Sequence, residues 1–164
     1  MRLLTIVLAV VTLFTTSATA LTIEEIERHW GATQNVRGTF TETYADGTQV
    51  TGSFLVENAG RMQMRYPNEV VLTIANGRML VDDPRSEPVR MSLGPLRQLF
   101  STQPNLDGII AGSGSDERVT TIALQDPLNR IEGTVLVTFD NATGKLLQWR
   151  NQTNGDNIVT QFTY

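Results

Sequence analysis

The chain has 164 residues, with 13 Lys and Arg against 17 Asp and Glu, one His, no Cys and 40% apolar residues. This length suits a single domain. Without cysteine there is no thiol nucleophile, disulfide framework or iron–sulfur cluster, and one histidine argues against a Cys/His zinc site. A formal net charge of −4 argues against nucleic acid as a partner, because phosphate binding needs a basic surface.

The first twenty residues have the pattern of a secretory signal. A short basic start precedes an apolar run from Leu3 to Phe14, and a small-x-small site ends at Ala20. The run is shorter than the ~20 apolar residues that span a bilayer. We therefore predict cleavage after Ala20, a single mature domain over residues 21–164 and a periplasmic location. The alternative is an N-terminal membrane anchor.

A short amphipathic helix is predicted next. Thr22 and Glu25 have the spacing of a capping box. Apolar residues then recur at i, i+3 and i+7 as far as Trp30, which places them on one face, and Gly31 ends the pattern. The helix should lie with this face on an apolar surface.

From Val36 onward the apolar period changes to two, which is typical of strands. Strands are expected at residues 36–44, 50–56, 61–66, 70–74, 78–81, 119–124, 133–139, 145–150 and 158–164. The dipeptides Asp46-Gly47 and Asn76-Gly77 favour hairpin turns between them. The pattern predicts a mainly β fold: one curved antiparallel sheet with two short helices.

Two segments interrupt the strand pattern. Around Leu96–Phe100 the apolar spacing becomes helical, and Pro95 is expected at the first helical position. The Gly- and Ser-rich stretch from Gly112 to Asp116 is expected to be a flexible polar loop. The second short helix therefore lies between two halves of the sheet.

No residues have the spacing of a catalytic site. His29 is the only imidazole, on the polar side of the first helix, and is expected to be solvated. Ser113 and Ser115 do not form a nucleophile elbow, and the acidic pair in Asp82-Asp83-Pro84 is expected to belong to a turn. We therefore expect a protein without enzymatic activity, bound metal or cofactor.

The pattern does predict more apolar sheet surface than two short helices can cover. Met62, Met64, Met79 and Met91 lie in or beside strands of the first half. Methionine side chains adapt to irregular apolar partners. They either fill the core or line a concave cavity for a hydrophobic ligand, and the sequence leaves both possibilities open.

The order and spacing of several segments resemble the periplasmic lipoprotein carriers, the LolA family. These segments are Val36–Glu42, Gly52–Val56, Gly60–Pro67, Asn76-Gly77, Pro95–Phe100, Gln125–Pro127 and Leu147–Trp149. No single one is diagnostic, but together they span nearly all of the mature chain. The resemblance implies an unclosed β-barrel with a helical lid. Such a carrier, expected to be a monomer, accepts triacylated lipoproteins from an inner-membrane ABC transporter and delivers them to an outer-membrane receptor.

The resemblance also suggests which residues form the site. The acyl-chain cavity would be lined by Phe40, Phe54, Val56, Met62, Met64 and Tyr66. The lid, which competes with the acyl chains for space, would be formed by Leu93, Leu96, Leu99 and Phe100. Asn58 stands where family members have an arginine that bonds the lid, which would make this chain a divergent member. The alternative function is a periplasmic sensor or scaffold of the same fold that binds a protein partner.

Overall fold

The computed structural model describes residues 19–126, 128, 133–153 and 156–164, so most of the predicted signal sequence lies outside the described residues. The elements are α1 (Ile23–Gly31), β1 (Gln34–Thr43), β2 (Gln49–Asn58), β3 (Arg61–Arg65), β4 (Val71–Ala75), β5 (Arg78–Asp82), β6 (Val89–Ser92), α2 (Leu96–Leu99), β7 (Ile110–Ser115), β8 (Val119–Gln125), β9 (Thr134–Asp140), β10 (Leu146–Thr153) and β11 (Asp156–Thr163).

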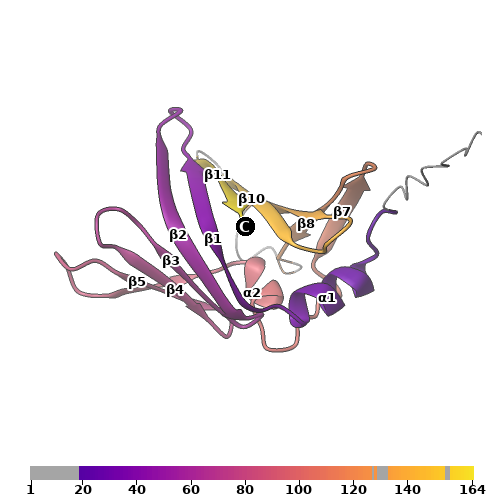
Figure 1. Ribbon diagram of the computed structural model, residues 1–164, viewed down its shortest axis with the longest axis horizontal. Coiled ribbons are helices and arrows are strands. Elements are labelled where there is room, and N and C mark those ends of the chain that lie inside the picture. The colour runs from indigo at the N-terminus through magenta and orange to yellow at the C-terminus, as the bar shows by residue number, and fades with distance from the viewer. Residues whose placement is uncertain (1–18, 127, 129–132, 154–155) are drawn as a thin grey trace, which may run out of the picture.

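The strands form one antiparallel sheet in the order β6-β5-β4-β3-β2-β1-β11-β10-β9-β8-β7. Strands β1–β6 and β7–β11 are two meanders, joined along the chain by α2 and in space by the pairing of β1 with β11. The sheet curls strongly, but β6 and β7 do not pair with each other, so it stays unclosed (Figure 1). The predicted fold class, mainly β with two short helices and an unclosed sheet, is confirmed.

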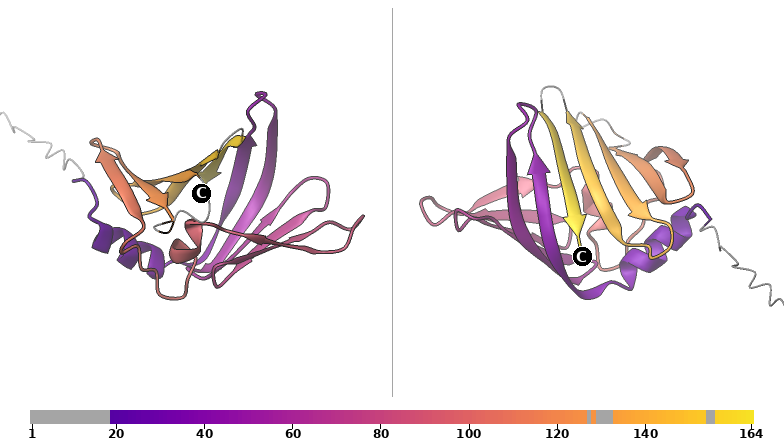
Figure 2. Two further views of the ribbon diagram at one scale, coloured as in Figure 1. Left: turned by 180° about the vertical axis from the view of Figure 1, so that it is seen from behind. Right: turned by 45° about the horizontal axis from the view of Figure 1, so that its top comes forward.

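The first helix begins as its sequence predicts. The Glu25 amide donates to Thr22 Oγ1 at 3.2 Å, and the Thr22 amide donates to Glu25 Oε2 at 2.8 Å, which completes the capping box. The apolar face buries Ile26 and Trp30 completely or nearly so. The helix lies under the half of the sheet formed by β7–β10, as the turned views of Figure 2 also show.

Contacts near both ends of α1 help to hold it against this half of the sheet. Just before the helix, the Leu21 amide donates to Thr120 Oγ1 of β8 at 3.0 Å. His29, expected on a solvated surface, is instead half-buried against the turn between β9 and β10. A Cβ at Gly144 of that turn would lie 2.6 Å from the His29 Cβ, so the turn can approach the helix because residue 144 is glycine.

Two strands were not predicted from the sequence, β6 and β7. The expected flexible loop over Gly112–Asp116 is wrong, because residues 110–115 pair with β8 from Ile110 opposite Leu124 to Ser115 opposite Thr120. A Cβ at Gly112 would meet nothing within 4 Å. Backbone pairing alone therefore defines this edge strand, and its side chains carry no strand signal.

The inner face of the sheet, the face turned toward α2, carries the hydrophobic core. Two reciprocal cross-strand pairs join β1 and β2 there, Phe40 with Gly52 and Phe54 with Gly38. A Cβ at Gly52 would lie 2.6 Å from the Phe40 ring, and one at Gly38 would lie 2.8 Å from the Phe54 ring. Each ring thus covers the glycine opposite it, which lets the aromatic side chains lie close to the sheet.

Candidate functional site

A cavity of about 240 Å³ lies between the inner face of the sheet and the segment that leads into α2. Its apolar lining consists of Leu72, Ile74, Met79, Leu93, Pro95, Leu96, Val135, Trp149 and Ile158. Glu42, Ser92, Asn151 and Thr160 add polar groups, and Gly94 and Gly133 complete the wall. Strands of both meanders contribute, so the cavity depends on the curl of the whole sheet.

The predicted lid residues divide into two groups. Leu93 and Leu96 line the cavity, whereas Leu99 and Phe100 are fully buried behind it. The Trp30 indole Nε1–H of α1 donates to the Leu99 carbonyl at 2.9 Å. The helical turn covers four residues, and Pro95 is its N-cap instead of its first residue. The segment is thus a short wall of the cavity that α1 holds from behind.

Aromatic contacts connect this segment to the cavity lining. The Phe100 ring packs edge-on against Trp30, with centroids 5.3 Å apart, and against Trp149 at 5.7 Å. Trp149 in turn contacts Phe162 of β11 at 4.8 Å. A displacement of α2 therefore separates Phe100 from one ring of the helix and one ring of the cavity wall.

The residues predicted to line the cavity lie deeper in the fold. Phe40, Phe54, Val56, Met62 and Met64 are at most 4% exposed and belong to the packed core. Tyr66 is partly buried and directs its hydroxyl to Glu42. None of the six is part of the lining of this cavity. These residues could contact a ligand only in a conformation in which the core has opened, so their role in binding stays a prediction.

Asn58 is the last residue of β2, directly before the tight turn into β3. Its side chain is exposed, and Oδ1 accepts a hydrogen bond from the Gly60 amide at 3.0 Å. Gly60 itself lies against the segment after α2, since a Cβ there would be 3.0 Å from the Thr102 amide nitrogen. Asn58 thus shapes a turn that touches the lid region, and its role as a lid switch stays a prediction.

A polar cluster at the cavity centres on Glu42, which the sequence reasoning did not single out. Its Oε1 accepts from the Tyr66 hydroxyl at 2.9 Å and from Thr160 Oγ1 at 3.3 Å, and its Oε2 accepts from the Tyr44 hydroxyl at 3.0 Å. Burial and the Glu42 carboxylate raise the pKa of Tyr66 well above its ordinary value, so this hydroxyl stays a donor. A carboxylate on the apolar face of a strand is the sequence signal that could have found it.

The acidic residues do not gather into a metal site. Across the described ranges, no group of three or more His, Asp and Glu side chains is placed to hold a metal ion. Asp83 instead forms an ion pair with Arg85 at 2.8 Å in the turn after β5. In the described part of the chain, the helices are too short or too polar to cross a membrane.

No family model and no curated protein matches this sequence. Among solved structures, the chain is similar to a LolA superfamily protein from Nitrosomonas europaea, with 11% identity, a TM-score of 0.45 and coverage of 88% of this chain and 93% of that one. It is also similar to an uncharacterized conserved protein from Thermus thermophilus, at 8% identity and a TM-score of 0.49 over 85% and 83% of the two chains.

A third similar structure is that of MucB in complex with MucA, with 16% identity and a TM-score of 0.46. The match covers 84% of this chain and 52% of that one.

Proposed function

We propose that this protein is a periplasmic carrier that binds the acyl chains of lipoproteins released from the inner membrane and delivers them to the outer membrane. The observation that carries the proposal is the apolar cavity of about 240 Å³ with Leu93–Leu96 as one wall. Each methylene exposed to water costs about 0.8 kcal/mol, so one acyl chain costs on the order of 10 kcal/mol. An acyl chain therefore needs an apolar sheath to cross an aqueous compartment.

The size of the cavity gives the lid its role. Pockets for small ligands commonly measure about 300–1,000 Å³, and this cavity is smaller. A lipoprotein's acyl chains therefore fit only if the segment before α2 moves aside and makes room for them. The chains then replace the contacts that Leu93 and Leu96 make in the empty protein. Since the lid's own apolar contacts compete with the ligand, binding is weak enough for release.

The remaining features of the proposal come from the sequence and from its resemblance to the LolA family. The signal-like segment at residues 1–20 supports export to the periplasm. The partners would be triacylated lipoproteins, an inner-membrane ABC transporter that releases them and, where one exists, an outer-membrane receptor. The protein would act as a monomer, as a binding protein without enzymatic activity or a cofactor.

A second candidate function is recognition of a protein partner by the same fold. One observation favours it: β6 is a free edge of the sheet, and its Val89 and Met91 are 54% and 52% exposed. An extended segment of a partner can add to such an edge as a further strand. This role would make the protein a periplasmic sensor or scaffold.

An environment-sensitive acyl probe tests the carrier. The probe should bind at micromolar concentration and be displaced stoichiometrically by a triacylated lipoprotein. Ile158→Trp fills the cavity from β11 and should abolish binding. Val159→Trp is the matched control, because successive strand residues face opposite sides of the sheet. Absence of probe binding, or equal binding by both variants, would remove the carrier function. Capture of an extended peptide by β6 would then favour the second candidate.

A further inference from the structure

The cavity lining contains a single ionisable side chain, that of Glu42. The other polar groups of the lining are neutral hydroxyls and one amide, from Ser92, Thr160 and Asn151. Inside a largely apolar cavity, one charged group decides orientation and specificity more than any neutral one, because the low dielectric strengthens its interactions.

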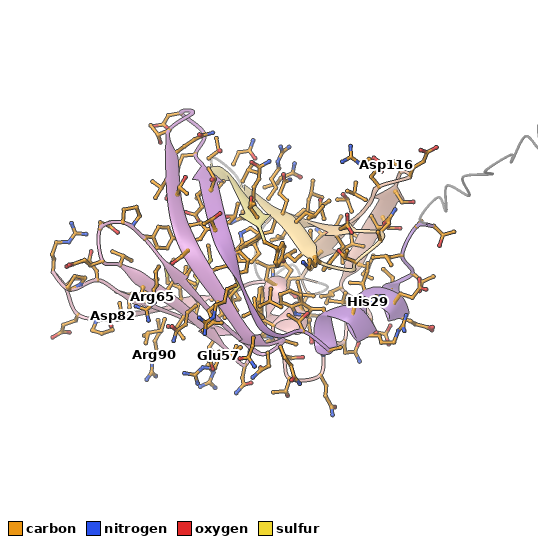
Figure 3. The ribbon with its side chains drawn as sticks, viewed as in Figure 1. His29, Glu57, Arg65, Asp82, Arg90 and Asp116 are labelled. Atoms are coloured by element: carbon orange, nitrogen blue, oxygen red, sulfur yellow. The ribbon has the colours of Figure 1, made fainter. Side chains whose placement is uncertain are left out.

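The Glu42 carboxylate has no cation beside it in the described part of the chain. The two salt bridges recorded there pair Arg61 with Glu57 and Arg85 with Asp83. Figure 3 shows Glu57, Arg65, Asp82, Arg90 and Asp116 on the outside of the fold. Glu42 is thus a carboxyl group in the cavity lining that accepts hydrogen bonds from hydroxyl groups and forms no ion pair within the described ranges.

Three hydroxyls donate to this carboxylate, two to Oε1 and one to Oε2. A carboxylate has about four lone-pair sites, so one further donor can bind, and it would do so at Oε2. The Tyr44 and Tyr66 hydroxyls stay protonated, because burial and Glu42 raise the pKa of each. The cluster therefore offers an incoming molecule an acceptor site.

The position of the cluster determines which part of a ligand it meets. Glu42 is near the end of β1 that leads into the hairpin with β2, at the top of Figure 1, whereas α2 lies at the bottom. Asn151, also of the lining, is near the end of β10 on the same side. A hydrocarbon chain that extends toward Leu93–Leu96 then has its head group beside Glu42.

We infer that Glu42 selects the head group of the ligand: the cavity takes acyl chains headed by an amide N–H or an ammonium and rejects free, ionised fatty acids. An N–H group donates to the open site on Oε2. A fatty-acid carboxylate in the same place brings two negative charges together without a counterion, which is strongly unfavourable away from bulk water. This inference rests on the proposed function, since it names the substrate class of the same cavity.

Three competitors with one chain length test the inference: an alkyl amine, a primary fatty amide and a fatty acid. Each displaces a neutral acyl-ester probe from the full protein, below its micelle concentration and at a pH where the acid is ionised. We expect the amine and the amide to compete at least about tenfold better than the acid. Equal competition by all three overturns the inference and leaves the carrier intact, whereas no probe binding overturns the carrier itself.

Glu42→Gln keeps the size of the side chain and removes its charge. In this variant the acid should compete within about threefold of the amide. Glu57→Gln is the matched control, because Glu57 pairs with Arg61 on the outside of the sheet. Persistent rejection of the acid by Glu42→Gln, or its loss in Glu57→Gln, contradicts the inference. The ranking in the unaltered protein is an independent test that needs no variant to fold.

Discussion

Trp30 of α1 donates its indole N–H to the main-chain oxygen of Leu99 in α2 at 2.9 Å, in a fully buried contact between residues 69 positions apart. This bond joins the first helix to the lid. Phe100 packs edge-on against the same indole. In the structure, the segment predicted to form the lid is thus held from α1, and the role of Asn58 as its switch stays a prediction.

The first prediction concerns Trp30→Phe. The variant keeps an aromatic ring but leaves the Leu99 oxygen buried without a donor, which costs about 1–3 kcal/mol. The urea midpoint of unfolding should therefore fall. The lid should also move away from α1 more readily, so the acyl probe should associate faster. Tyr164→Phe is the control, because it removes a similar bond to the Leu146 oxygen, away from the lid. If both variants leave the association rate unchanged, the tether has no role in gating.

The second prediction concerns Gly77 in the turn between β4 and β5. Gly77 has φ of +74°, and a Cβ there would collide with the side chain of Arg97 on α2. Gly77→Ala should therefore both strain the turn and push the lid segment. Gly47→Ala has the same positive-φ strain, about 1–3 kcal/mol, without any neighbour within 4 Å. If Gly77→Ala loses more stability than Gly47→Ala, and only Gly77→Ala takes up the probe faster, the contact between the turn and α2 is confirmed.

The third prediction concerns Leu99→Asp. Leu99 is completely buried, and a carboxylate placed there without a partner costs several kcal/mol. The carboxylate reaches water at the lowest free-energy cost if the lid moves away from α1. This movement increases access to the cavity. Arg97→Asp places the same group on the exposed side of the turn and serves as the control. Stopped-flow binding of the acyl probe measures the effect, and unchanged kinetics in Leu99→Asp would count against a moving lid.

The fourth prediction asks whether the loaded cavity extends to the residues predicted from the sequence. With ¹³C-methyl methionine, the acyl probe should shift the NMR signal of Met79, which lines the cavity. It should also shift those of Met62 and Met64, if the chains reach the packed core. A shift confined to Met79 would restrict the ligand to the cavity seen in this structure.

The fifth prediction concerns pH. Hydrogen bonds from the Thr22 amide and hydroxyl hold the pKa of Glu25 below its ordinary value. A carboxyl whose pKa is lower in the folded chain stabilises the protein above its unfolded pKa of about 4.3, and this contribution is lost as the pH falls through the folded value. Glu25→Gln should lower the urea midpoint at neutral pH and converge with the unaltered protein in acid. Parallel pH curves would contradict this.

The sequence alone was sufficient to predict features that depend on residues close together in the chain. The capping box of Thr22 and Glu25, the burial of Ile26 and Trp30 and the period-two strands all appear as predicted. These features depend on neighbours in the chain, so residue types and spacing determine them. The edge strands β6 and β7 were missed, because an edge strand needs backbone partners more than particular side chains.

Only the tertiary structure determines which residues line the cavity. The alternation of side chains along a strand shows that Glu42 shares a face with Phe40. It does not show which strands neighbour β1 on that face. The pairing of β1 with β11 brings Glu42 next to Thr160, 118 residues further along the chain, and the curl of the sheet sets Trp30 behind Leu99. Contacts of this kind depend on sheet order and curvature, which arise from the packing of the whole chain. No single position in the sequence therefore predicts them.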